Sequence, residues 1–248
     1  VQQTIDFCTK HQLPFEQCGK LIVATNDLEM KRMQILFERC KENGLNPELL
    51  NENQLKEIEP NITGLGAIKV KETGIIDYIS MTKTIAKEFV AMGGKIKLNA
   101  EVIHLNETKD QASVKIKSGE TYNSSYLIAC AGLQSDRIAK LMGLKIDYQT
   151  VPFRGDYYQL NKRFNKVVKH LIYPIPDPAY PFLGVHLTKM IDGSVTVGPN
   201  AVLNFSREGY NKINFNLKDL KQMLFFSGFW KLILKNWKPA INELYSSL

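Results

Sequence analysis

The chain alternates between short apolar runs and helical stretches, and its clearest example is the segment 126–143, YLIACAGLQSDRIAKLMG. The first six residues are apolar without alternation, which is typical of a strand buried on both faces of a sheet. The run ends at Gly132, and a helical pattern begins at Ser135 and Asp136. This order favours a phosphate-bearing ligand, because the glycine admits close backbone approach and the helix end offers unpaired N–H groups. The alternative is an ordinary strand-to-helix turn.

The remaining pattern predicts a mixed α/β order. One helix is expected at 1–13, and a second begins after a capping box at Asn26 and Glu29. Further helices are expected at 51–59, at 77–92 and, with interruptions, at 217–248. Strands are expected at 15–25, 64–70, 95–98, 101–105, 113–117, 120–122, 126–131, 171–175, 182–188 and 194–197. The helix-to-strand step at 77–98 is typical of a parallel sheet, whereas the later strands, separated by turns, predict an antiparallel one. We therefore expect two interleaved layers.

Composition narrows the class of protein. The 248 residues suffice for one large or two ordinary domains, and the net charge is +7. The lysines are scattered, so nucleic acid is not an expected partner. The four cysteines form no CxxC pair and have no histidine at zinc spacing, which predicts reduced thiols in an intracellular compartment and no metal site. No secretory signal or membrane-spanning run is visible, and the start at Val1 within a helical pattern suggests a fragment.

Among the four histidines, His186 is the candidate for chemistry. His11 at a helix end and His170 in a basic loop are expected to be solvated, and His104 lies among polar residues. Strand alternation points His186 away from its apolar neighbours, and Gly184 leaves room beside it. Such a histidine is a candidate general base, and the alternative is a hydrogen-bonded structural histidine.

Two arginines and one turn are weaker candidates for ligand binding. The planar guanidinium groups of Arg154 and Arg207 suit a carboxylate or a phosphate, although a salt bridge to a nearby acid is the better interpretation of each alone. The turn at 198–201, which contains Asn200, offers backbone groups at a strand end. The C-terminal helices set aromatic residues opposite lysines, and we favour packing within the protein over a peripheral membrane contact.

Seven segments occur in order: GKLIVAT, TGIIDY, ACAGLQSDRIAKL, VPFRGDYY, IYPIPDPAYPFLGVHLT, DGSVTVGPNAVL and REGY. Together they resemble the L-2-hydroxyglutarate dehydrogenase (oxidase) family, flavoproteins of the D-amino-acid oxidase superfamily. The resemblance implies FAD as cofactor and oxidation of L-2-hydroxyglutarate to 2-oxoglutarate by hydride transfer to the flavin, with oxygen or a quinone as the electron acceptor left open. It also implies a partial FAD-binding dinucleotide fold (73–145) interleaved with an antiparallel-sheet substrate domain (1–72 and 146–215), followed by a helical segment (216–248).

The resemblance also assigns roles to residues. It implies that Val102, Ala131, Gly132 and Asp136 contact the cofactor. It implies that His186 is the catalytic base over the flavin. The substrate carboxylates are then expected to be held by Arg154, Tyr157, Tyr173 and Asn200, residue types that orient carboxylates.

The chain departs from this family in two ways. It contains no GxGxxG loop, and it ends before the family's C-terminal flavin-binding segment. We therefore expect the central part of such an enzyme, inactive by itself. Two alternatives remain: another oxidase of the superfamily, acting on an amino acid or glycerol 3-phosphate, or a non-catalytic binding module. The expected location is cytoplasmic or mitochondrial, with membrane association as an alternative.

Overall fold

The computed structural model describes residues 1–178, 184–211 and 214–235. The chain divides into two compact units, the first formed by Val1–Gly94 with Gly155–Asn200 and the second by Lys95–Arg154 with Ala201–Leu248. The mixed α/β class predicted from the sequence is confirmed. Residues 182–183 of a predicted strand and 236–248 of the predicted C-terminal helix lie outside the described residues.

The helices of the first unit are α1 (Gln2–Lys10), α2 (Asp27–Glu42), α3 (Glu52–Ile58) and α4 (Tyr78–Ala91), with a short 3-10 turn η2 (Lys162–Phe164). Three of the first unit's α-helices, α2, α3 and α4, begin after a residue whose side chain caps the helix. The Asn26 side chain accepts a hydrogen bond from the Glu29 amide at 2.9 Å, and Asn51 forms a full capping box with Gln54. These bonds satisfy amide groups that a helix start otherwise leaves unpaired.

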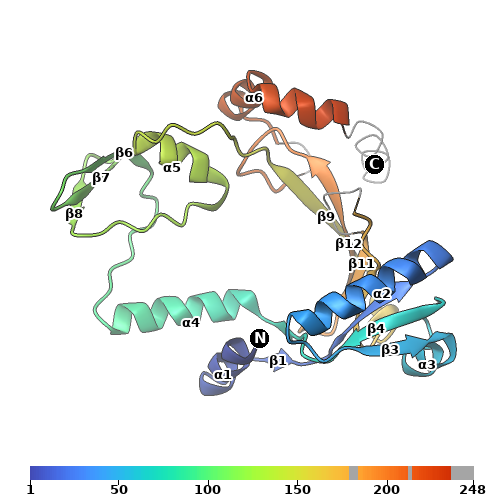
Figure 1. Cartoon of the computed structure of the whole chain (residues 1–248). Helices are drawn as coiled ribbons and strands as arrows, with labels where there is room; N and C mark the ends of the chain where they lie inside the picture. Colours follow the sequence, from blue (N-terminus) through green and yellow to red (C-terminus); the bar gives the residue numbers. More distant parts are fainter. Residues whose placement is uncertain (179–183, 212–213, 236–248) are drawn as a thin grey trace. The chain divides into compact units, whose positions relative to one another are not determined.

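Seven strands form the large sheet (Figure 1). In spatial order they are β3 (Glu48–Asn51), β4 (Gly66–Val70), β2 (Lys20–Ala24), β10 (Leu171–Pro174), β11 (His186–Lys189), β12 (Val195–Leu203) and β9 (Phe153–Gln159). β2 and β10 run parallel, while β10, β11 and β12 are antiparallel neighbours, as the turns between them predict. Two short strands, β1 (Phe15–Glu16) and β5 (Ile75–Ile76), pair separately.

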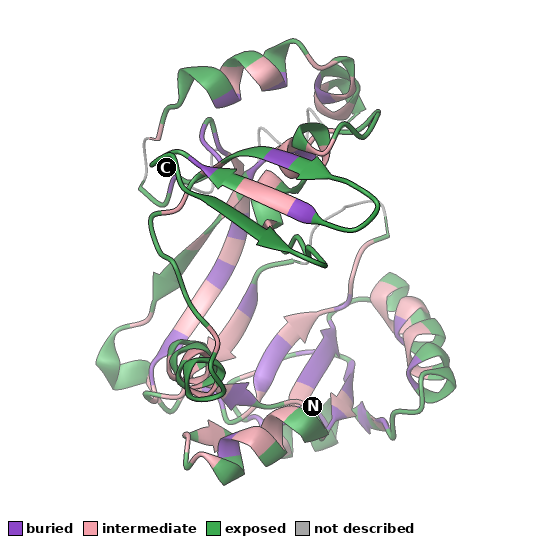
Figure 2. Ribbon diagram, turned by 90° about the vertical axis from the view of Figure 1, so that its left-hand side faces the viewer, coloured by how far each residue is buried: buried purple, intermediate pink, exposed green. Residues whose placement is uncertain are grey.

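Both faces of this sheet are covered near β2, which explains why its sequence, KLIVA, is apolar throughout. Leu21 and Val23 point to one face, where they pack with Leu55 of α3. Ile22 points to the other face and packs with Met33 of α2. Figure 2 shows that buried residues concentrate on these strands. The sheet is therefore anchored by its α2 and α3 layers at one end, and β10 and β11 extend from that anchored region.

The second unit contains a small antiparallel sheet and short helices. Its elements are β6 (Val102–Glu107), β7 (Ala112–Ile116), β8 (Thr121–Ser124), a 3-10 turn η1 (Gly132–Gln134), α5 (Ser135–Leu141) and α6 (Leu217–Leu224). Residues 227–235 are also helical. The meander and α5 confirm the sequence prediction. Within the described residues, no helix has the length and apolarity that crossing a bilayer requires.

Two predicted strands of the second unit are absent. Residues 95–98 and 126–131 have no strand structure, and Tyr126 and Ile128 are 88% and 86% exposed. A strand buried on both faces needs strands beside it and layers above and below. Within the described part of this unit, no strand pairs with 126–131. The apolar run therefore has the composition of a buried strand without the neighbours that would bury it.

Candidate functional site

His186 lies at the start of β11 beside Tyr173 of the neighbouring strand β10 and Tyr157 of β9, another strand of the same sheet. Its ring stacks on Tyr173 of β10, with centroids 4.1 Å apart and planes inclined by 12°. Tyr157 of β9 presents an edge-to-face contact, with centroids 6.4 Å apart. The side chain of His186 is buried, at 9% exposure. The first unit thus brings together three of the residues that the sequence analysis assigned to catalysis and substrate binding.

A backbone hydrogen bond sets the tautomer of His186. Its Nδ1 lies 3.1 Å from the carbonyl oxygen of Gly184. A carbonyl oxygen can only accept a hydrogen bond, so a neutral His186 carries its proton on Nδ1. Its Nε2 then holds a lone pair, and no described residue forms a hydrogen bond with Nε2. The imidazole is therefore oriented by one nitrogen and chemically available through the other.

The two tyrosines differ in exposure. Tyr157 is 53% exposed, whereas Tyr173 is partly buried. Burial, and secondly the nearby Tyr157, raise the pKa of the Tyr173 hydroxyl above its usual value. Tyr173 is therefore protonated at neutral pH and is a hydrogen-bond donor beside the imidazole.

A glycine of β12 allows the strands around His186 to approach closely. Gly198 is the register partner of His186, and its φ of +146° is a conformation that other residues rarely adopt. A side chain there would place its Cβ 2.7 Å from the carbonyl oxygen of Asp156 in β9. Gly198, the first residue of the GPNAV segment, is therefore needed for the close approach of the β12 backbone to β9 at this point. Asn200, two residues later in β12, is itself buried.

Arg154 is placed differently from Tyr157. The two residues are three positions apart in β9, and alternation along a strand sends their side chains to opposite faces. The Arg154 guanidinium donates a hydrogen bond to the carbonyl oxygen of Asn211. Arg154 and Asn211 both belong to the second unit, whereas Tyr157 belongs to the first. The hydrogen bond described for Arg154 is thus made within its own unit.

Three of the four residues predicted to contact a cofactor lie together in the second unit. Val102 of β6 and Ala131 line one pocket of about 240 Å³, with Ile138 of α5 at its side. Gly132 follows directly, with a φ of +51° and open space where a side chain would project. This turn leaves the backbone of 131–132 accessible, as binding of a large flat or phosphate-bearing group requires.

Asp136, the fourth predicted contact, is part of a buried ion pair. Its carboxylate accepts hydrogen bonds from both terminal nitrogens of Arg207 and from the Thr150 amide. Asp136 and Arg207 are 1% and 3% exposed. Burial alone would raise the pKa of Asp136, but the hydrogen bonds from Arg207 and Thr150 outweigh it and lower that pKa. The salt-bridge interpretation of Arg207 is confirmed.

Arg207 also connects this pair to the Gly132 turn. Its guanidinium donates to the carbonyl oxygen of Leu133 at 2.7 Å, and its backbone amide donates to Asp219 at 2.8 Å. Asp219 in turn pairs with Arg137 of α5. The position of the turn after Gly132 is therefore tied to α5 and α6 through two buried carboxylates.

The prediction that His170 and His11 are solvated is wrong. The His170 side chain is 14% exposed, and its Nδ1 lies 2.7 Å from the carboxylate of Glu59, which is 1% exposed. His11 lies 3.1 Å from Glu88. Both partners are distant in sequence, so no local pattern could indicate them. Sequence reasoning also missed Lys20, whose ammonium lies over the Tyr173 ring, 5.3 Å from its centroid.

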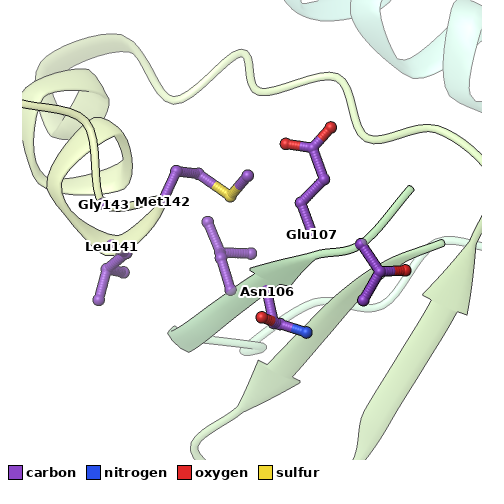
Figure 3. Close-up of a pocket in the computed structure, with 7 residues that line it drawn as sticks. Asn106, Glu107, Leu141, Met142 and Gly143 are labelled. Carbon is purple, nitrogen blue, oxygen red and sulfur yellow. The ribbon is translucent and has the colours of Figure 1, made fainter. Parts of the chain in front are cut away.

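A larger hollow of about 560 Å³ lies next to the pocket of about 240 Å³ in the second unit and shares Leu105 with it (Figure 3). It is formed by Asn106 and Glu107 at the end of β6 and by Leu141, Met142 and Gly143 at the end of α5. None of the residues predicted from the sequence lines it. The clusters around His186 and Gly132 are therefore better candidates for function than the larger cavity.

Comparison with known proteins bears on the origin of these clusters. A family model described as "FAD dependent oxidoreductase" matches residues 4–237. The chain belongs to this family. L-2-hydroxyglutarate dehydrogenase of Escherichia coli K12 is 49% identical to this chain, over 98% of this chain and 57% of the relative. The human mitochondrial L-2-hydroxyglutarate dehydrogenase is 39% identical over 98% of the chain and 55% of the relative.

Solved structures of other proteins are also similar to this chain in fold. L-α-glycerophosphate oxidase of Mycoplasma pneumoniae, with FAD bound, matches with a TM-score of 0.72 at 22% identity, over 88% of this chain and 57% of that chain. Glycine oxidase of Bacillus cereus matches with a TM-score of 0.68 at 17% identity, over 92% of this chain and 60% of that chain. These likenesses concern the fold. The chain spans somewhat more than half the length of the curated relatives it matches.

Proposed function

We propose that this chain carries the substrate-binding and part of the cofactor-binding residues of an FAD-dependent enzyme that oxidises L-2-hydroxyglutarate to 2-oxoglutarate. The observation that supports this most directly is the orientation of His186 by the Gly184 carbonyl, which leaves Nε2 able to accept a proton. The names of the relatives, each an L-2-hydroxyglutarate dehydrogenase, supply the substrate. An intracellular location, mitochondrial in the animal relatives, is part of the same proposal.

Oxidation of a 2-hydroxy acid needs a base for the hydroxyl proton and groups that hold the carboxylates. In this proposal His186 Nε2 removes the hydroxyl proton, and the resulting imidazolium keeps its Nδ1–H bond to Gly184. The Tyr173 hydroxyl, protonated at neutral pH, donates to the substrate beside the imidazole. Stacking on Tyr173 restricts rotation of the imidazole, so the base keeps a constant direction. FAD, when bound, accepts the hydride from C2 of the substrate.

The residues around Gly132 fit a role in holding part of FAD. The backbone at 131–132 is accessible, and the pocket lined by Val102 and Ala131 is apolar on most sides. The side chain of Asp136 is engaged by Arg207 and the residue is buried, so we assign to Asp136 the role of holding the turn that presents the 131–132 backbone. The pocket's volume of about 240 Å³ suits one portion of the cofactor.

The experiment uses the protein expressed from its complete reading frame and reconstituted with FAD. Anaerobic addition of L-2-hydroxyglutarate is expected to bleach the flavin absorbance near 450 nm, a band common to oxidised flavins, while glycine and glycerol 3-phosphate leave it unchanged. His186→Asn is expected to slow bleaching by about 100- to 10,000-fold, the usual contribution of a general base. Flavin content should be retained.

His104→Asn is the matched control, because His104 is an exposed strand histidine of the second unit. Equal bleaching rates in wild type and His186→Asn would remove His186 from the role of base. Bleaching by glycine or glycerol 3-phosphate instead of L-2-hydroxyglutarate would favour another oxidase of the superfamily. A folded protein that stays colourless with FAD would favour a non-catalytic module.

A further inference from the structure

Lys20 lies on the same face of the large sheet as Tyr173 and His186, two residues along β2 from Ile22, the register partner of Tyr173. The strand order β2, β10, β11 brings these three residues onto neighbouring strands of one sheet. Lys20 is opposite Val70, which belongs to the apolar cluster on the α2 face, and Tyr173 packs against that same cluster. The ammonium group, the phenol ring and the imidazole are therefore on one face of the first unit.

The rings and the ammonium are arranged in sequence. The Tyr173 and His186 rings are 4.1 Å apart and nearly parallel, which leaves no space for a cation between them. The Lys20 ammonium is 5.3 Å from the Tyr173 centroid, so Lys20 and His186 flank the ring on its two sides. A ligand lying along these three side chains would meet the ammonium, the phenol and the imidazole in that order.

Lys20 has no acidic partner among the residues that the structure describes. Lys20 is a partly buried residue, and its ammonium lies over the aromatic face of Tyr173. A cation–π contact compensates only part of the lost hydration, so a carboxylate would add a charge-assisted hydrogen bond. By contrast, Lys189 at the far end of β11 is paired with Glu16 at 2.5 Å.

The spacing matches a five-carbon dicarboxylate. With standard bond lengths, the 2-hydroxyl oxygen and the distal carboxylate oxygens of 2-hydroxyglutarate lie roughly 5 Å apart when extended. A hydrogen bond of about 2.8 Å at each end extends this reach to roughly 10 Å. The Lys20 ammonium is 5.3 Å from the Tyr173 centroid, and the His186 centroid is 4.1 Å from it, so the ammonium and the imidazole are close enough for one such ligand to reach both.

From this geometry we propose that Lys20 binds the distal carboxylate of the substrate and thereby selects a dicarboxylate over a monocarboxylic 2-hydroxy acid. The inference rests on the proposed function, because it takes the hydroxyl group of the substrate to be at His186. The carboxylate next to the reacting carbon then lies on the Tyr157 side of His186, and the distal carboxylate extends past the Tyr173 hydroxyl to Lys20.

The test compares Lys20→Met with wild type on two substrates, L-2-hydroxyglutarate and L-2-hydroxybutyrate, which differ in the distal carboxylate. We expect kcat/KM for L-2-hydroxyglutarate to fall roughly 10- to 100-fold, the range of a hydrogen bond to a charged group, mainly through KM. The change for L-2-hydroxybutyrate should be less than about 3-fold, since no contact to it is lost. Lys20→Arg should restore part of the preference.

Lys69→Met is the matched control. Lys69 is on the neighbouring strand β4, and its register partner is Leu21, so its side chain is on the opposite face of the sheet. This variant is expected to keep the wild-type preference. An equal loss on both substrates in Lys20→Met would indicate a merely structural effect and overturn the inference, as would an unchanged preference.

A binding measurement separates this inference from the proposed function. Calorimetric titration with glutarate and with butyrate requires no turnover. Wild type should bind glutarate at least about 10-fold more tightly than butyrate, and Lys20→Met should lose that difference. If the preference is present without flavin bleaching, the proposed function fails and the Lys20 site stands. If bleaching occurs and glutarate shows no preference, the reverse holds.

Discussion

At the scale of single residues, the Asp136 carboxylate and the Arg207 guanidinium each depend on the other, because both are almost fully removed from water. Asp136→Asn would leave Arg207 with a neutral partner in the same buried position. We expect the free energy of unfolding to fall by about 3–5 kcal/mol at pH 7, the usual cost of breaking a buried pair. Urea denaturation measures this change in the free energy of unfolding. Asp110→Asn is the control, because Asp110 is an exposed aspartate of the same unit.

The stability difference between wild type and Asp136→Asn is expected to depend on pH. The pKa of Asp136 is lowered in the folded protein relative to its ordinary value of 3.8. Its stabilisation is therefore complete above pH 3.8 and is lost as the pH falls below that value towards the folded-state pKa. The stability difference between wild type and Asp136→Asn should shrink as the pH drops below about 4. A difference that grows on acidification would contradict this assignment.

The cluster around His186 shows how far residue patterns reach. Alternation along β11 predicted that His186 points away from its neighbours in the strand, and the His186 ring stacks on Tyr173. The room expected beside Gly184 is occupied, because a Cβ there would lie 2.7 Å from Pro174. The alternation rule could not identify Lys20, because its contact depends on parallel pairing between β2 and β10, strands separated by about 150 residues in sequence. Likewise, Asp136 appeared as a helix-start residue, and its partner Arg207 is 71 residues away.

At the scale of elements, the segment 126–131 has the composition of a buried strand and the environment of an exposed loop. Among the hydrogen bonds of the described residues, none is donated by a backbone amide of this segment. We expect these amides to exchange with deuterium at least about 100-fold faster than those of β2, whose residues are buried within paired strands. Hydrogen exchange with mass spectrometry reads both segments in one experiment.

Segments of equal apolarity serve as internal controls for that prediction. β10 has the same composition type as 126–131, and it is paired on both sides, with β2 and β11. Slow exchange at 126–131, similar to that of β10, would mean that the segment is paired in solution and that the predicted strand exists. The contrast also explains why helices were predicted better than this strand. Caps and periodicity are local, whereas a strand needs neighbours.

At the scale of the whole molecule, each unit has its own buried carboxylate that joins segments distant in sequence. In the first unit, Glu59 at the end of α3 accepts hydrogen bonds from the Lys169 amide at 2.8 Å and from the His170 amide at 2.7 Å, directly before β10. In the second unit, Asp136 joins α5 to Arg207. Each unit is assembled from two separate stretches of chain, so these carboxylates join segments that the sequence alone does not bring together.

This organisation predicts local rather than general losses of stability. Glu59→Gln removes a charge that receives three hydrogen bonds, including one from His170, and should cost about 1–3 kcal/mol. Because a compact unit with its own core opens largely as a unit, we expect faster exchange in α3, β2 and β10, with α5 and α6 unchanged. Asp136→Asn should do the opposite, accelerating exchange in α5 and α6. If either variant accelerates exchange evenly across both units, the chain unfolds as one cooperative structure, and the division into two units has no energetic counterpart.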